Sequence, residues 1–123
     1  MTDNCVFCEI VAGNIPSAIV AQNDEILAFR DIEPAAPIHI LLIPKRHIAD
    51  SAAGLTREQG ALLGKLFELA ARIANEFNLN TGWRIVSNVG QGAGQTVFHL
   101  HFHLLGGWNE NNTGARIDKG TGS

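Results

Sequence analysis

Hydrophobic and polar residues recur along this 123-residue chain with two different periods. In the middle of the chain, apolar residues repeat at steps of three and four, which places them on one face of a helix; they are Leu62, Leu66, Leu69, Ile73 and Phe77. Thr56 and Gln59 have the spacing of a capping box, so this helix is expected to begin there and to end near 78–82. The same period predicts a short helix over 6–13.

Short apolar runs rich in β-branched residues predict strands. They lie at 17–21, 25–29, 38–43, 83–88 and 96–105, separated by turn or loop residues and, between the third and the fourth, by the long helix. The strands fall on both sides of one long helix, without the regular strand–helix alternation of a parallel sheet. The pattern therefore predicts an α+β fold: a mostly antiparallel sheet with one long helix packed on it and a short N-terminal helix.

The last predicted strand alternates histidine with apolar residues. His99, His101 and His103 are expected on one face, about 6.6 Å apart along the strand. The other face, expected to pack toward the long helix, carries Phe98, Leu100, Phe102 and Leu104. Such a row could serve packing, metal binding or catalysis. Strict alternation disfavours packing, and the outer pair, about 13 Å apart, is too far apart to share one ion easily with the middle histidine. A histidine nucleophile with imidazole helpers is favoured.

A glycine-rich loop leads directly into this row. Gly90, Gly92 and Gly94 leave backbone N–H groups unshielded, and Gln95 and Thr96 add side-chain donors. Alone, the loop would be interpreted as a flexible turn between two strands. Next to the histidines it predicts a phosphate cradle, in which an imidazole attacks phosphorus while the loop donors stabilise the charge on the phosphoryl oxygens.

Composition excludes several other classes of function. The net charge of −3 and the pI of about 5.9 argue against a protein that binds duplex nucleic acid through a basic face. No apolar run reaches the length of a membrane-spanning helix, and the N-terminus lacks the basic region of a signal peptide. We therefore expect a cytoplasmic protein with one domain over 1–108 and a poorly ordered tail over 109–123.

Residues 99–105 read His-φ-His-φ-His-φ-φ, where φ is apolar, and this resembles the signature of the histidine triad (HIT) family. Further stretches resemble the Hint branch, the histidine triad nucleotide-binding proteins: 15–16, 27–29, 31–32, 36–39, 43–45, 47, 88 and 94–98. The resemblance covers residues 5–107. After Gly107, however, Trp108 follows directly, and 109–123 does not match the short tail that often ends proteins of this branch.

The resemblance implies a HIT-like fold and a purine nucleotide hydrolase that cleaves AMP–amine or acyl-AMP compounds through a nucleotidyl-histidine intermediate. The alternatives are a diadenosine polyphosphate hydrolase and a non-catalytic nucleotide-binding module. It implies that His101 is the nucleophile, that His103 contacts the phosphate or leaving group, and that His39 orients an imidazole. It also implies a homodimer and no cofactor for the chemistry.

The resemblance assigns the nucleotide contacts as well. The base would lie among Val6, Phe7, Ile10 and Phe29. Asp31 would hold the ribose hydroxyls, and Ile32 would lie against the nucleoside. The phosphate would contact Asn88, Gly94, Gln95 and Thr96. Plain core packing is the alternative for Ile10 and Phe29, and a turn is the alternative for Asp31.

Cys5 and Cys8 have the spacing of half a zinc site. The resemblance implies that His47 and His99 complete a structural Cys₂His₂ site. His99 would then serve catalysis through its position only. A pair of free thiols is the alternative.

Overall fold

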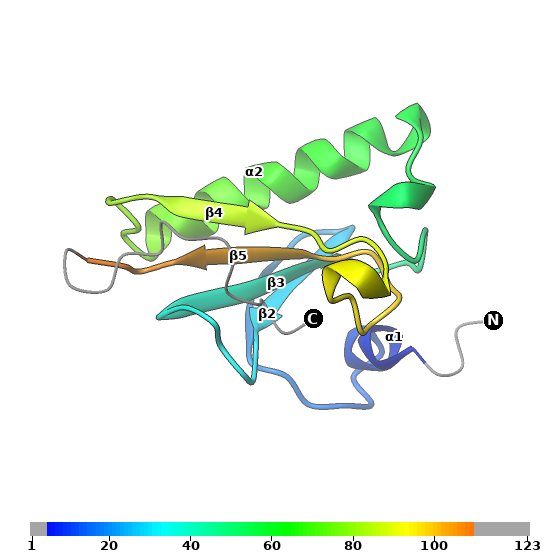
Figure 1. The fold of residues 1–123 in the computed structure, drawn as a ribbon, viewed down its shortest axis with the longest axis horizontal. Coiled ribbons are helices and arrows are strands. Elements are labelled where there is room, and N and C mark those ends of the chain that lie inside the picture. Colours follow the sequence, from blue (N-terminus) through cyan, green and yellow to red (C-terminus); the bar gives the residue numbers. More distant parts are fainter. Residues whose placement is uncertain (1–4, 110–123) are drawn as a thin grey trace.

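The computed structural model describes residues 5–109, and they form a five-stranded sheet in the order β1-β2-β3-β5-β4 (Figure 1). The strands are β1 (Ile19–Gln22), β2 (Ile26–Arg30), β3 (Ile38–Pro44), β4 (Trp83–Val86) and β5 (Phe102–Gly106). Every neighbouring pair is antiparallel. The predicted α+β class with an antiparallel sheet is confirmed.

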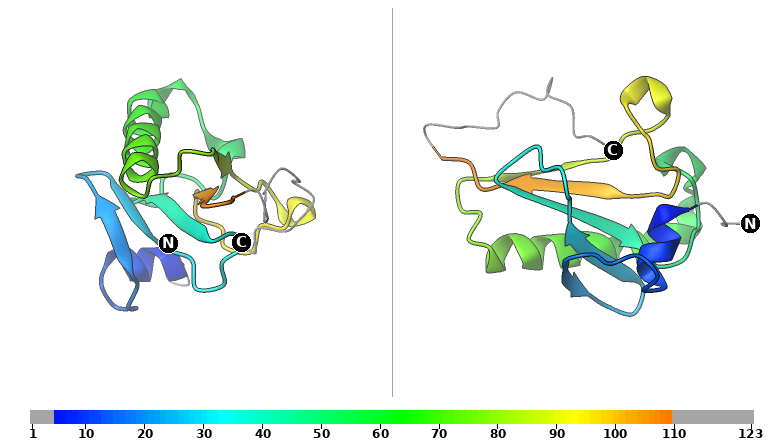
Figure 2. Two further views of the ribbon diagram at one scale, coloured as in Figure 1. Left: turned by 90° about the vertical axis from the view of Figure 1, so that its left-hand side faces the viewer. Right: turned by 90° about the horizontal axis from the view of Figure 1, so that it is seen from below.

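Two helices cover opposite faces of this sheet (Figures 1 and 2). The long helix α2 (Gly60–Glu76) follows the 3-10 turn η2 (Arg57–Gln59), where Thr56 and Gln59 form the predicted capping box. It ends at Glu76, and Asn78, just beyond the C-cap Phe77, has a left-handed φ of 56°, a conformation common just after a helix. The short helix α1 (Val6–Val11) lies on the opposite face, and two more 3-10 turns, η1 (Ala52–Gly54) and η3 (Gln91–Ala93), lie in loops.

Side chains alternate between the two faces of the sheet and form two apolar clusters. The cluster under α2 contains Ile26, Ala28, Ile40, Leu42, Leu66, Leu69, Ile73, Leu100, Phe102 and Leu104. The cluster under α1 contains Phe7, Leu27, Phe29, Leu41 and Ile43. His39 on β3 and His103 on β5 have the parity of this second cluster, so the histidine face of the sheet is the one that α1 covers.

The last strand is shorter than predicted. A strand was expected over 96–105, but β5 begins only at Phe102. The backbone before it bonds to groups outside the sheet: the Leu100 N–H donates to the Ala49 carbonyl, and the His101 carbonyl accepts from the Ser87 hydroxyl. The expected alternation persists for Leu100, Phe102 and Leu104, but Phe98 is 41 % exposed rather than packed toward α2.

The other strand boundaries differ from the predicted ranges by at most two residues. Beyond β5, the Thr81 hydroxyl donates to the Trp108 carbonyl and the Arg84 guanidinium lies 5.4 Å from the centre of the Trp108 ring. The predicted tail lies outside the described residues from 110 onward. Within residues 5–109, no helix is long and apolar enough to cross a membrane.

Candidate active site

The orientation of the middle histidine follows from one hydrogen bond. His101 is 2 % exposed, and its Nδ1 lies 2.6 Å from the carbonyl oxygen of His99. A carbonyl can only accept, so Nδ1 carries the imidazole proton. In the neutral form of the ring the lone pair is therefore on Nε2, as a histidine nucleophile requires.

A second chain of hydrogen bonds determines the protons on His39 and His103. The Ala35 N–H donates to Nδ1 of His39 at 2.9 Å, so the His39 proton is on Nε2 and is donated to Nδ1 of His103 at 2.8 Å. The His103 proton is then on Nε2. That nitrogen is buried and has no hydrogen-bond partner in the described part of the chain. It is a donor available to a bound ligand, 5.1 Å from His101 between ring centroids.

The imidazoles of His39 and His103 are both neutral at pH 7. Burial, assisted by the charges of His101 and His39, lowers the pKa of His103 to about 3. Burial also lowers the pKa of His39, and the neighbouring carboxylate of Asp31 opposes that effect only in part.

Asp31 belongs to the same cluster, with Oδ2 3.4 Å from Nε2 of His39. The ligand atoms of Asp31, His39 and His103 lie within 4.8 Å of one another, close enough to be considered for a metal. A metal on Nε2 of His39 would move the proton to Nδ1, where it would oppose the N–H of Ala35. The cluster is therefore a hydrogen-bond chain rather than a metal site. The Asp31 Oδ1 also accepts from the Glu33 N–H at 2.8 Å.

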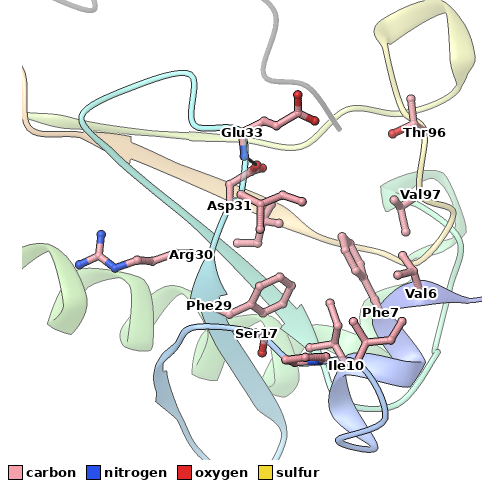
Figure 3. A pocket seen from close by; sticks show the side chains of 14 residues that line it. Val6, Phe7, Ile10, Ser17, Phe29, Arg30, Asp31, Glu33, Thr96 and Val97 are labelled. Atoms are coloured by element: carbon pink, nitrogen blue, oxygen red, sulfur yellow. Dashed lines mark hydrogen bonds between the residues drawn. The ribbon is translucent and has the colours of Figure 1, made fainter.

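A cavity of about 330 Å³ opens beside the histidines, between α1 and the end of β2 (Figure 3). Its walls are mainly apolar, with carboxylates at one side, which is the usual character of a small-molecule site. Seven of the predicted nucleotide-contact residues line it: Val6, Phe7, Ile10, Phe29, Asp31, Ile32 and Thr96. Phe7 joins the cavity to His101, since its ring packs edge-on against the His101 imidazole at 5.0 Å and against Phe29 at 5.7 Å.

The glycine-rich loop folds into η3 and requires glycine at both ends. Gly90 and Gly94 have φ values of 85° and 93°, which side-chain-bearing residues rarely adopt. Gly92 has no such φ, so its prediction as part of the cradle has no support from backbone conformation. Asn88 lies just before the loop, two residues after β4, and is half-buried.

Gln95 was expected to offer side-chain donors to a phosphate, but its bonding in the structure is internal. It is 3 % exposed, and its Oε1 accepts from the Gly90 N–H at 2.9 Å. Its Nε2 donates to the carbonyls of Asp50 at 2.7 Å and Val97 at 3.0 Å. Both amide protons are thus engaged, and the side chain holds the loop against its neighbours.

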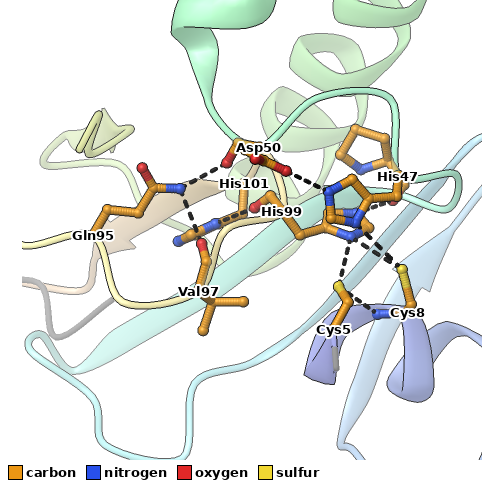
Figure 4. Close-up of polar contacts among 9 residues, drawn as sticks. Cys5, Cys8, His47, Asp50, Gln95, Val97, His99 and His101 are labelled. Atoms are coloured by element: carbon orange, nitrogen blue, oxygen red, sulfur yellow. Dashed lines mark hydrogen bonds and ion pairs between the residues drawn. The ribbon is translucent and has the colours of Figure 1, made fainter. Parts of the chain in front are cut away.

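The two cysteines and two histidines of the predicted metal set meet in one place (Figure 4). Sγ of Cys5 lies 3.2 Å from Nδ1 of His99, and Sγ of Cys8 lies 3.6 Å from Nδ1 of both His47 and His99. In a tetrahedral zinc site, bond lengths of about 2.3 Å to sulfur and about 2.05 Å to nitrogen separate an S from an N ligand by about 3.6 Å. The observed separations fit such an ion.

The tautomers of these two histidines also fit a metal. The Nε2–H of His47 donates to Oδ1 of Asp50 at 2.8 Å, and the Nε2–H of His99 donates to the Pro44 carbonyl at 2.8 Å. Both Nδ1 lone pairs are therefore directed at the thiols, with the outer-sphere oxygen partners typical of histidine ligands. No local sequence pattern predicts these partners, apart from the Asp50 carboxylate three residues after His47.

His99 thus belongs to two sites at once. Its ring faces the cysteines, and its carbonyl orients His101. Burial, only partly offset by the bond to Pro44, lowers its pKa to about 4, so the ring is neutral and able to bind a metal.

A family model described as the HIT domain matches residues 12–110. The chain belongs to the HIT family. Among its relatives, Protein HitA of Neisseria gonorrhoeae is 47 % identical over 104 residues, which cover 85 % of this chain and 96 % of HitA. The 14 kDa zinc-binding protein of Brassica juncea is 43 % identical over 105 residues, with coverage of 83 % and 91 %. Adenylylsulfatase HINT1 of Arabidopsis thaliana is also 43 % identical over 105 residues, with coverage of 83 % and 70 %.

Solved HIT structures share the fold described above. A HIT family hydrolase from Clostridium thermocellum superposes with a TM-score of 0.86 at 39 % identity, covering 95 % of this chain and 99 % of that one. A histidine triad nucleotide-binding protein from Candida albicans has a TM-score of 0.73 at 30 % identity, covering 82 % and 73 %. These likenesses confirm the predicted HIT-like fold.

Proposed function

We propose that this HIT protein is a nucleotide hydrolase of the Hint branch. It cleaves purine nucleoside phosphoramidates and acyl-adenylates through a covalent nucleotidyl-His101 intermediate. The observation that carries the proposal is the proton arrangement of the triad. The carbonyl of His99 leaves the lone pair of His101 on Nε2, and His103 presents a buried, unpartnered N–H beside it. A nucleophile and a donor for the phosphate group thus lie together next to the cavity. The names of HINT1, an adenylylsulfatase, and of the clostridial HIT family hydrolase support hydrolysis of a nucleotide as the reaction class.

In the first step, Nε2 of His101 attacks the α-phosphorus. An N–P bond forms, the bond from phosphorus to the amine nitrogen or acyl oxygen breaks, and its electron pair leaves with the departing group. An amine takes up one proton from water as it leaves, whereas a carboxylate leaves as its anion. The Nε2–H of His103 donates a hydrogen bond to a phosphoryl oxygen or to the departing atom. Backbone donors of the glycine loop stabilise the charge that develops on the phosphoryl oxygens.

In the second step, water attacks the phosphorus of nucleotidyl-His101. The N–P bond breaks, its electron pair returns to Nε2, and the water releases one proton. The nucleoside monophosphate leaves, and His101 returns to its starting tautomer because Nδ1 keeps its proton against the His99 carbonyl throughout. Since His103 and His39 stay neutral, they act as donors without placing a positive charge beside the attacking nitrogen.

The cavity accepts the nucleoside. The purine lies in the apolar part formed by Val6, Phe7, Ile10 and Phe29, with Ile32 at the rim, and the ribose hydroxyls donate to Asp31. The phosphate contacts Asn88, the Gly94 backbone and Thr96. Gln95 contributes by holding the loop, because its own donors are engaged.

The protein binds one structural zinc ion through Cys5, Cys8, His47 and His99. The donor set, the Nδ1 tautomers and the zinc-binding relative support this. With all four positions filled by protein, the ion supplies no catalysis and ties α1 to the sheet. A reducing compartment such as the cytoplasm keeps both thiols available to it.

A homodimer is also part of the proposal, formed through α2 and the edge strand β4. An edge strand leaves backbone groups for another chain to pair with. Phe67 on α2 and Trp83 on β4 are large apolar side chains that are exposed to 44 % and 41 % and could be covered by a second copy. Light scattering on the purified protein tests the oligomeric state.

The test of function compares an AMP–amine conjugate, an acyl-adenylate and a diadenosine polyphosphate as substrates. We expect the first two to be cleaved faster, and an adenylated protein to appear by mass spectrometry after rapid alkaline quenching. His101→Asn should abolish both turnover and the adduct but still bind AMP. Faster cleavage of the polyphosphate would favour the diadenosine polyphosphate hydrolase, and AMP binding without turnover would favour a binding module. A His101→Asn variant with parental turnover would refute the covalent mechanism.

A further inference from the structure

The backbone of His101 lies just outside the hydrogen-bonded part of the sheet. The last residue pairs of β5 with its neighbours are Val86 with His103 and Leu42 with Phe102. His101 therefore precedes the ladder on both sides. It is almost completely buried, and a buried carbonyl needs a hydrogen-bond donor.

A side chain supplies that donor. The Ser87 hydroxyl, on the first residue after β4, donates to the His101 carbonyl at 2.7 Å. On the other side, the Leu100 N–H donates to the Ala49 carbonyl at 2.9 Å. These two bonds hold the backbone around the nucleophile against segments outside its own strand. Ser87 does not line the cavity and is not part of the metal cluster.

This bond bears on the reacting atom through the geometry of His101. The imidazole bonds backward to the carbonyl of His99 at 2.6 Å, so the direction of Nε2 depends on the dihedral angles of residue 101. The Ser87 hydroxyl holds the peptide that follows the same residue. Rotation of that peptide would change the backbone at 101 and turn Nε2 away from the line of attack.

We propose that Ser87 is a positioning residue for the nucleophile. Its hydroxyl holds the His101 peptide so that Nε2 stays aligned with the phosphorus, while Ser87 itself touches neither substrate nor metal. The inference rests on the proposed function and adds a residue to that site. Displacement of a reacting group by about 1 Å can cost about 100-fold in rate, so a modest relaxation of this peptide has a measurable effect.

The experiment compares Ser87→Ala, which removes the hydroxyl, with Ser87→Thr, which keeps it. The matched control is Thr81→Ala, because the Thr81 hydroxyl also donates to a backbone carbonyl, that of Trp108, at 2.8 Å. Single-turnover adenylation of His101, AMP affinity and the melting temperature are measured for each variant. Imidazole ¹⁵N chemical shifts report the tautomer of His101 independently of catalysis.

For Ser87→Ala we expect adenylation about 10-fold slower, AMP affinity within about twofold of the parent, and a mixture of His101 tautomers. Ser87→Thr should recover most of the rate, and Thr81→Ala should leave rate and tautomer unchanged. An unchanged rate and tautomer in Ser87→Ala would overturn the inference, as would a loss explained by lower stability alone. If the parent protein forms no adduct, the proposed function fails, and the tautomer of His101 in Ser87→Ala still decides the role of Ser87.

Discussion

Acidification should destabilise this protein through His103 in particular. The ring is completely buried, and burial lowers its pKa from 6.5 to about 3. In the unfolded chain the same imidazole regains its ordinary pKa of about 6.5. Between these two pH values the unfolded state binds more protons than the folded state, so the free energy of unfolding falls as pH falls through this window.

The size of the effect follows from the two pKa values. From about pH 7.5 to about pH 5, the unfolded state gains about 1.5 pKa units of proton-binding free energy at His103, while the folded state gains almost none. At about 1.36 kcal/mol per unit, this single residue should contribute about 2 kcal/mol of lost stability. The contribution is fully present above about pH 6.5 and is lost toward about pH 3.

Urea unfolding of the parent and of His103→Gln measures this contribution. Glutamine does not titrate, and its Oε1 can accept the hydrogen bond from His39. The metal cluster and His39 are the same in both proteins, so their own pH dependence largely cancels in the difference. We expect the stability advantage of the parent over the variant to shrink by about 2 kcal/mol between about pH 7.5 and about pH 5. A difference that stays constant across this range would show that His103 is not a buried, neutral imidazole.

Three further predictions concern the loop, the cavity and the metal cluster. Gly94→Ala should lower the free energy of unfolding by about 1–2 kcal/mol, because Gly94 has a φ of 93°. Gly92→Ala should leave the free energy of unfolding almost unchanged, since nothing lies within 4 Å of a Cβ added there; urea melts of both variants check this. Phe7→Ala should weaken AMP binding at least about 10-fold and Phe7→Leu should recover part of it, measured by calorimetry, because Phe7 packs on both His101 and the cavity wall. Asp50→Asn should weaken zinc binding about 10- to 100-fold in a chelator competition while all four ligands remain; unchanged affinity would argue against a role for Asp50 in orienting the metal ligand.

The local patterns predicted the parts of the fold that depend on near neighbours. The capping box at Thr56 and the repeat of three and four residues placed α2, because both signals arise within a few turns of one helix. Alternation placed Leu100, Phe102 and Leu104 under α2 and the histidines on the opposite face. The extent of the last strand was wrong, because a strand needs a partner, and the partners of 100 and 101 come from loops instead.

The chemistry of the site depended on contacts that no local pattern contains. The bond between His39 and His103 joins residues 64 apart in the chain, and the contact of Cys5 with His99 spans 94. The sequence alone determined that the three imidazoles lie opposite Leu100, Phe102 and Leu104 and beside a glycine loop, because alternation along an extended backbone follows from consecutive residues and persists before β5 begins. Only the tertiary structure decided which nitrogen of each ring carries the proton, because that is set by the donor or acceptor that folding brings against it.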